Sequence, residues 1–294
     1  RLDLVADVDE RLMQPIEQMG LDVIDAGLGL SALFEGVERG IIPESDAPDF
    51  VVQAKGLGNL EAAVRTVAIL GTPQAAQYPA LRAVGDGPQA LVERYPEMQD
   101  IVFTCGQGSL GNPGHCNALW TFLMPFSRFF SHYSGQIYKI AGALPPPGSD
   151  QETVRAFSRQ IVERMLQREY FWLLCNAFSH CAFTFIVFSQ DGKGEELRKD
   201  DLLIRLLRHY GIHLTNAELI EFGQAFWAQS IDLKCQHGWR PRSAAGFPRR
   251  IYEALSATLD RPPDELEALM GQLIAEWKRQ ASEVLTRFGY QADW

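Results

Sequence analysis

An apolar stripe at helical spacing recurs along the chain and constrains its fold more than any other feature. After Pro262 and Pro263, which a first helical turn tolerates, apolar residues follow mostly at intervals of three and four residues as far as Phe288. This spacing predicts one helix of roughly seven turns with a buried face. The same periodicity begins after Gln151 and predicts a second amphipathic helix.

Local signals predict the limits of two further helices. Thr215-Asn216-Ala217-Glu218 matches the capping box, in which a hydroxyl and a carboxylate satisfy the free amides of a helix start. Leu219 and Phe222 then continue an apolar face. A leucine-rich segment, 200–210, is followed by Gly211, a residue that often stops a helix. Both segments are therefore predicted to be helical.

Strand-like sequence is scarce. The segment 98–104, apolar in its second half, is the one short strand candidate. The most apolar stretch, 170–188, is interrupted by polar residues and is predicted to be a buried core helix. The predicted fold class is therefore mainly α, with a soft domain boundary near residue 100.

The composition is typical of a globular protein with one large core or two moderate ones. Hydrophobic residues make up 46% and charged residues 22% of the 294 residues. The net charge of -10 argues against a nucleic-acid partner, because the chain has no excess of Lys and Arg to displace counterions from phosphates. No run of about 18 apolar residues occurs, so no membrane span is predicted.

The cysteines and the first residues bear on the compartment. Five cysteines are an odd number in a large acidic chain, which is unlike a disulfide framework, so a reducing cytoplasm is expected. No C-x-x-C pair occurs, so any iron-sulfur or zinc site would need ligands from elsewhere. The start of the chain lacks the pattern of a secretory signal, and Arg1 in place of an initiator Met leads us to expect upstream sequence.

Three features carry candidate chemistry, each with an ordinary alternative. The glycine-rich loop 105–115 would let backbone amides approach an anion, but it lacks the G-x-x-x-x-G-K-[ST] order of a nucleotide site. His132 lies in an aromatic run four residues after Arg128 and could exchange protons near neutral pH; a satisfied core histidine is the alternative. Cys175 and Cys181 would point about 120° apart on one continuous helix, so buried apolar thiols are the alternative to a shared metal.

Four segments, taken in order, resemble one family. The first reads E-Q-M-G-L-D-V-I-D-A-G from Glu17 to Gly27, and 33–41 follows it. It resembles the D-x-x-G-L-D-T-I-S-x-G stretch and the trailing E-x-x-x-x-G helix of the aldehyde ferredoxin oxidoreductases, which include the tungsten subunit of class II benzoyl-CoA reductase. In that family this loop contacts the pterin. The resemblance therefore implies that Gly20, Leu21 and Asp22 bind the cofactor, with Asp22 pointing at it.

The second segment is the loop from Cys105 to His132. It resembles the family's K-G-x-E loop, its D-P-R-G segment and then A-L-x-Y-A-T-S-x-R-G-A-x-H, with Cys105 where the family has Lys. Arg128 and His132 keep the four-residue spacing of R-G-A-x-H. The resemblance implies that His132 is the active-site imidazole, which handles a proton beside the metal, with Arg128 as its catalytic neighbour.

The third segment, 176–183, reads N-A-F-S-H-C-A-F and resembles the family's D-x-x-G-L-C-K-F. In the family this cysteine is the fourth ligand of a [4Fe-4S] cluster beside the pterin. The resemblance implies that Cys181 is the cluster ligand, with Cys175 as the fallback. It also implies that Asn176 and His180 lie at the pterin, although both depart from the family's residues.

The fourth segment covers 216–252. Leu219 to Leu233 resembles E-L-x-x-x-G-E-R-I-x-x-L-E-R, and Gln236 to Arg250 resembles R-E-G-x-x-R-x-D-D-x-L-P-x-R, with Ala244 and Ala245 in place of the double Asp. The family's N-terminal β domain, and the C-x-x-C-x-x-x-C triplet that supplies the other cluster ligands, have no counterpart in the sequence. We therefore expect a fragment or an enzyme divided between polypeptides.

The resemblance implies two helical domains, 1–100 and 101–294, like the second and third domains of the family. It implies a tungsten or molybdenum bis-pterin oxidoreductase acting on a small aldehyde, carboxylate or acyl thioester. A [4Fe-4S] cluster would pass electrons to a ferredoxin-like carrier or iron-sulfur subunit, in a homo- or hetero-oligomer. One alternative is a cofactor-free helical scaffold or interaction subunit, which the substitutions at Cys105, Asn176 and Ala244-Ala245 favour. Another is a generic helical binding protein, since core helices are alike in unrelated folds.

Overall fold

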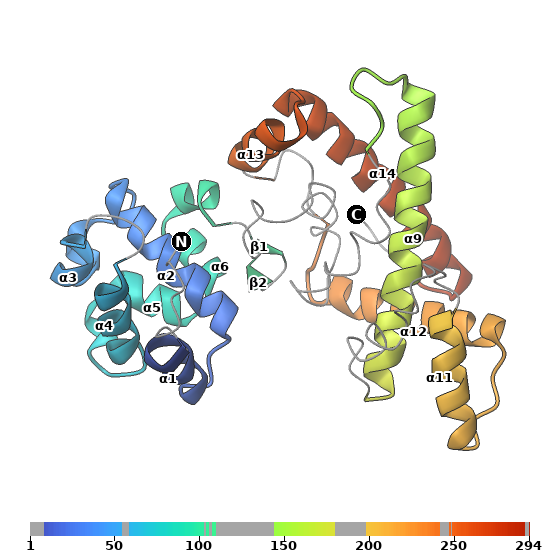
Figure 1. The fold of residues 1–294 in the computed structure, drawn as a ribbon, viewed down its shortest axis with the longest axis horizontal. Helices are drawn as coiled ribbons and strands as arrows, with labels where there is room; N and C mark the ends of the chain where they lie inside the picture. Colours follow the sequence, from blue (N-terminus) through green and yellow to red (C-terminus); the bar gives the residue numbers. More distant parts are fainter. Residues whose placement is uncertain are drawn as a thin grey trace. The chain divides into compact units, whose positions relative to one another are not determined.

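The structure, a computed structural model, describes residues 9–54, 59–102, 104–105, 108–109, 144–179, 198–241, 247, 249–291 and 294. These residues are mainly helical, as predicted (Figure 1). Contacts within the chain divide it into two units. Unit 1 comprises Arg1–Tyr133 and Ala245–Leu266, and unit 2 comprises Ser134–Ala244 and Glu267–Trp294. The division into family-like domains at residue 100 stays a prediction.

Unit 1 contains short helices and a two-residue ladder. The ladder is antiparallel and joins β1 (Thr104–Cys105) to β2 (Gly108–Ser109), with Thr104 opposite Ser109. The helices are η1 (Asp9–Met13), α1 (Gln14–Gln18), α2 (Val23–Glu38), η2 (Glu44–Asp46), α3 (Asp49–Val52), α4 (Leu60–Leu70), η3 (Ala75–Gln77), α5 (Pro79–Gly85), α6 (Pro88–Arg94), η4 (Pro96–Asp100) and α13 (Arg249–Leu259).

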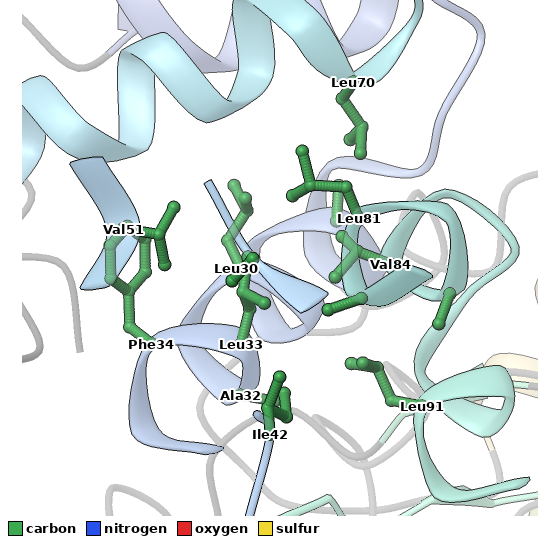
Figure 2. Close-up of a cluster of buried hydrophobic side chains, with 14 of the residues drawn as sticks. Leu30, Ala32, Leu33, Phe34, Ile42, Val51, Leu70, Leu81, Val84 and Leu91 are labelled. Atoms are coloured by element: carbon green, nitrogen blue, oxygen red, sulfur yellow. The ribbon is translucent and has the colours of Figure 1, made fainter. Parts of the chain in front are cut away.

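Helix α2 supplies the centre of the unit 1 core. Its Leu30 and Leu33 are fully buried and cluster with apolar residues of α3, α4, α5 and α6 (Figure 2). Gly36 allows this close packing, because a Cβ there would lie 2.7 Å from Sδ of Met98 and 2.8 Å from Cδ1 of Ile42. The core of unit 1 therefore depends on a position in α2 that has no side chain.

Unit 2 contains long helices. They are α9 (Gln151–Ala177), α11 (Arg198–His209), α12 (Asn216–Gln236) and α14 (Pro263–Arg287), whose first residues belong to unit 1. Helices α9 and α12 pack closely at Gly223, where a Cβ would lie 3.0 Å from Cδ1 of Leu174 and 3.1 Å from Cβ of Tyr170. Trp227 and Trp277 are buried in this unit.

The predicted helices are confirmed at their ends. Helix α14 begins at Pro263 and α9 at Gln151. Helix α12 begins with a complete capping box, in which Thr215 and Glu218 each accept a hydrogen bond from the other's amide. Helix α11 ends just before Gly211, whose φ is +79°. No helix in the described part of the chain combines the length and apolar character that a membrane crossing requires.

Two predictions of detail are wrong. Phe222 is 46% exposed, because the buried face of α12 follows Leu219, Gly223 and Trp227 toward α9. The strand candidate 98–104 begins inside the 3₁₀ helix η4, which Pro96 starts and whose Met98 is fully buried, and of its described residues Thr104 alone lies in a strand, β1. A proline at the first helical position and one buried contact here outweigh the strand preference of the apolar residues that follow.

The sequence predicts one helix over 170–188, and this prediction is wrong. Helix α9 ends at Ala177, and Ser179 has a φ of +57°, which lies outside the helical region. Left-handed backbone interrupts the ladder of hydrogen bonds on which a helix depends. Apolar composition alone did not reveal this break, because serine is not a usual stop signal.

Candidate functional site

The Gly20-Leu21-Asp22 turn connects α1 to α2. The amide of Gly20 donates to the carbonyl of Glu17 at 2.9 Å, and the amide of Leu21 donates to the carbonyl of Ile16 at 3.2 Å. These bonds form a Schellman motif, which needs left-handed backbone at Gly20, where φ is +74°. Leu21 packs against the unit 1 core. Gly20 therefore ends α1, and Leu21 anchors the turn.

Asp22 caps the start of α2. Its Oδ1 accepts a hydrogen bond from the amide of Asp25 at 2.8 Å, and its carbonyl accepts one from the amide of Ala26 at 2.9 Å. The carboxylate thus satisfies an amide that a helix start leaves free and lies at the positive end of the helix dipole. Asp22 is exposed, and a Cβ on Gly20 would meet nothing within 4 Å. The turn therefore lies at the surface of unit 1, and its contact with a pterin stays a prediction.

The end of α9 falls inside the third motif. The amide of Phe178 donates to the carbonyl of Leu174 at 3.0 Å, and the left-handed Ser179 follows. A residue other than glycine seldom takes this conformation. Phe178 contacts Phe222 of α12, with ring centroids 6.3 Å apart. A ring contact between helices therefore accompanies the unusual turn.

The last turn of α9 contains Cys175, which precedes the third motif, and Asn176, the first residue of that motif. Cys175 and Asn176 have helical backbone, and their side chains lie outside the description. The expectation that Cys175 and Cys181 point apart assumed one continuous helix through both. Because α9 ends at Ala177, that assumption is wrong and the objection to a shared role is removed.

The remaining predicted site residues, Arg128, His132, His180 and Cys181, lie outside the described residues. The convergence of the Cys181 thiol and the His132 imidazole on one centre stays a prediction. Within the described ranges, no three side chains of His, Cys, Asp or Glu gather as a metal site would need. The structure therefore describes the turn before α2 in unit 1 and the end of α9 in unit 2, each by itself, and the proposed ligand Cys181 lies outside the described residues.

Glu35 connects the first motif to the fourth within unit 1. Its carboxylate accepts a hydrogen bond from Nη1 of Arg250 at 2.9 Å and forms an ion pair with Arg39 at 2.5 Å. The Glu35 side chain is only 14% exposed, so water screens these pairs less than it screens surface pairs. The contact with Arg250 links α2 to α13.

Sequence reasoning missed this pair. Glu35 occupies the first fixed position of E-x-x-x-x-G, and Arg250 occupies the last fixed position of L-P-x-R. These fixed letters could have identified both residues as candidates. Nothing local identifies them as partners, because they lie 215 positions apart.

A second polar cluster lies at the end of α6. The hydroxyl of Tyr95 donates to Oδ2 of Asp46 at 2.6 Å and accepts from Nε of Arg94 at 3.2 Å. Burial, and then the hydrogen bond to Asp46, raise the pKa of Tyr95 to about 12. The phenol therefore stays neutral at physiological pH and connects α6 to η2.

Comparison with known proteins gives no match. No family model matches the chain, and neither a curated protein nor a solved structure does. The resemblance to the oxidoreductase family therefore depends on the four sequence segments alone.

Proposed function

We propose that the chain is part of a tungsten or molybdenum bis-pterin oxidoreductase. In this proposal, electrons pass between an aldehyde, carboxylate or acyl thioester and a ferredoxin-like carrier or iron-sulfur subunit through a [4Fe-4S] cluster. The order of the four motifs along the chain is the starting point. The structural observation that supports the proposal most is the ion pair between Glu35 and Arg250, because it joins two of those motifs in space.

Backbone geometry at one motif position also supports the proposal. Ser179 stands where the family pattern has Gly, and its φ of +57° is one that glycine adopts without strain. Gly20, Gly40 and Gly238 stand at family Gly positions and also have positive φ, between +70° and +82°. Those three follow helix ends, where Gly is favoured in any fold. Ser179 likewise follows the end of α9, so all four positions agree with the family pattern, and none is specific to it.

The proposed roles belong to a few residues. The Gly20-Leu21-Asp22 turn would orient the pterin at the start of α2, where Asp22 is exposed. Cys181 would supply one thiolate to the cluster, and His132 would hold and release the proton that accompanies electron transfer. When bound, the metal and its pterins would supply the exchange of electrons with the substrate.

Metal analysis of the native protein tests the proposal. The full protein, with any polypeptide that copurifies, is isolated without oxygen, and tungsten, molybdenum and iron are measured against protein concentration. We expect one of the two heavy metals together with iron. A fully folded protein without these metals would contradict the proposal.

The alternative, a cofactor-free helical scaffold, predicts a fully folded protein without these metals. The alanines at 244 and 245, the cysteine at 105 and the asparagine at 176 replace residues that the family pattern uses. If these changes removed the cofactor, the helical units would still fold around their own cores, because those cores are apolar and need no metal. Metal content in folded protein therefore separates the two functions.

A further inference from the structure

The four tryptophans whose side chains the structure describes form a connected cluster inside unit 2. Trp277 of α14 lies at its centre, with its ring centroid 6.3 Å from that of Trp227. Trp239 and Trp294 contact the same ring at centroid distances of 6.4 and 5.2 Å. All three contacts are edge-to-face, the geometry that packed aromatic rings prefer.

The cluster runs from the core to the surface. Trp227 and Trp277 are almost completely buried, whereas Trp239 and Trp294 are partly exposed. Ser282 accepts a hydrogen bond from Nε1 of Trp294 at 2.8 Å, which fixes the outer ring. Neighbouring rings in contact thus form a path between solvent and the interior of the helix bundle.

A carboxylate lies at the buried end of this path. Nε1 of Trp227 donates to Oε2 of Glu169 at 2.6 Å, and Glu169 is half-buried in α9. An indole that loses an electron becomes a far stronger acid than the neutral indole, so a carboxylate already hydrogen-bonded to its N–H can accept the proton. The hydrogen bond therefore makes Trp227 the ring at which oxidation can be followed by local proton transfer.

We propose that this cluster is a one-electron relay, in which oxidation at Trp239 or Trp294 is passed through Trp277 to Trp227. The proposal concerns described residues of unit 2 and does not depend on a metal or pterin. It assigns a redox activity to aromatic residues that also pack the core.

Each step balances in electrons and protons. A surface one-electron oxidant, such as an oxygen-derived radical, takes one electron from Trp294 or Trp239 and is reduced. Trp277 returns one electron to that ring, and Trp227 then returns one to Trp277. The Nε1 proton of Trp227 moves to Glu169, which leaves a neutral radical and a carboxylic acid. A reductant such as a thiol or ascorbate later supplies one electron, and the proton returns to the indole.

Photochemical oxidation of the full chain tests the relay. The background carries Trp120→Phe and Trp172→Phe, which removes the two tryptophans whose side chains the structure does not describe. A flash of light and a soluble quencher convert a ruthenium polypyridyl complex into a one-electron oxidant. Transient absorption and freeze-trapped electron paramagnetic resonance then distinguish the neutral tryptophan radical from its radical cation. We expect the neutral radical.

Three variants and one control assign the path. Trp227→Phe should abolish the neutral radical, and the double variant Trp239→Phe/Trp294→Phe should do the same by replacing both outer indoles with phenyl rings, which are much harder to oxidise. Glu169→Gln keeps a hydrogen-bond acceptor but not a base, so the radical cation should replace the neutral form. Tyr210→Phe removes the oxidisable phenol of an exposed tyrosine that is not in the cluster and should change nothing.

Circular dichroism of each variant shows whether its helices are intact. If Trp227→Phe loses its fold, the conservative Glu169→Gln variant decides the question. An unchanged yield of neutral radical in folded Glu169→Gln or Trp227→Phe protein would overturn the relay. Absence of any tryptophan radical in the parent background would also overturn it, and would leave the cluster a packing feature only.

Discussion

Glu35 and Arg250 are separated by 215 positions, yet the carboxylate of one accepts a hydrogen bond from the guanidinium of the other at 2.9 Å. The pair joins α2 to α13, which follows α12 of unit 2 in the chain but belongs to unit 1. It also brings together fixed positions of two motifs that resemble one family. The contact therefore connects two of the segments on which the proposed function depends.

Removing this pair should weaken the packing of α13 against α2. Arg250→Gln deletes one of the two cations beside a carboxylate that is mostly shielded from water. We expect the free energy of unfolding to fall by about 1 kcal/mol, with less effect at high salt. Hydrogen exchange should show faster exchange of amides in α13. Arg11→Gln breaks the more exposed pair with Glu61 and serves as the control, with a smaller change expected. Equal losses of unfolding free energy in the two variants would show that the shielding of Glu35 from water does not strengthen its ion pair.

Two substitutions at Asp22 separate capping from cofactor binding. Asp22→Ala removes the acceptor for the Asp25 amide and should lower the free energy of unfolding by about 1 kcal/mol. Asp22→Asn keeps a good cap, so denaturant unfolding should be close to that of the parent protein. Under the proposed function, Asp22→Asn should still reduce pterin retention. Full retention of pterin in this variant would restrict Asp22 to its structural role.

Gly36 and Gly27 lie in the same helix and should respond in opposite directions to alanine. Gly36→Ala places a Cβ 2.7 Å from Met98 Sδ, so crowding should destabilise the protein by about 1–3 kcal/mol. Gly27→Ala meets nothing within 4 Å and should stabilise α2 by up to about 1 kcal/mol through helix propensity. Thermal unfolding of both variants checks the prediction. Destabilisation by Gly27→Ala would show that the packing around α2 is misplaced.

Tyr95 should make stability depend on pH in the alkaline range. Its folded pKa is raised from 10.0 to about 12, so the neutral phenol is favoured by folding. The contribution is fully present below pH 10, and it is lost as the pH rises toward 12. Tyr95→Phe should lower the free energy of unfolding by about 1–2 kcal/mol near neutral pH and remove this part of the alkaline decline. If the free energies of unfolding of the two proteins changed in parallel with pH, Tyr95 would not be the source of the alkaline decline.

The sequence predicted helices where local signals were strong. The capping box at Thr215, the prolines before α14 and the glycine after α11 each act through neighbouring residues, so a linear pattern reveals them. The break after Ala177 was not predictable in this way, because Ser179 takes a conformation that its residue type does not favour. Phe222 was assigned to the wrong face because the contact of α12 with α9 is tertiary.

The candidate site was predicted only in part. Gly20, Leu21 and Asp22 form a turn whose local role follows from helix-end chemistry, and they also carry the family resemblance. The partnership of Glu35 with Arg250 and the ring contacts around Trp277 join distant segments. Such contacts depend on how helices pack, and a single sequence contains no local signal for them. The roles of His132 and Cys181 stay predictions.

The most direct test of the proposed oxidoreductase is the iron content of a matched pair of cysteine variants. Cys181→Ser and Cys235→Ser are purified without oxygen from the native assembly, and the latter changes a half-buried thiol in α12 that belongs to no proposed ligand set. The proposal predicts that Cys181→Ser loses iron and the paramagnetic signal of the reduced cluster, while Cys235→Ser retains both. Equal iron content and identical signals in the two variants would contradict it.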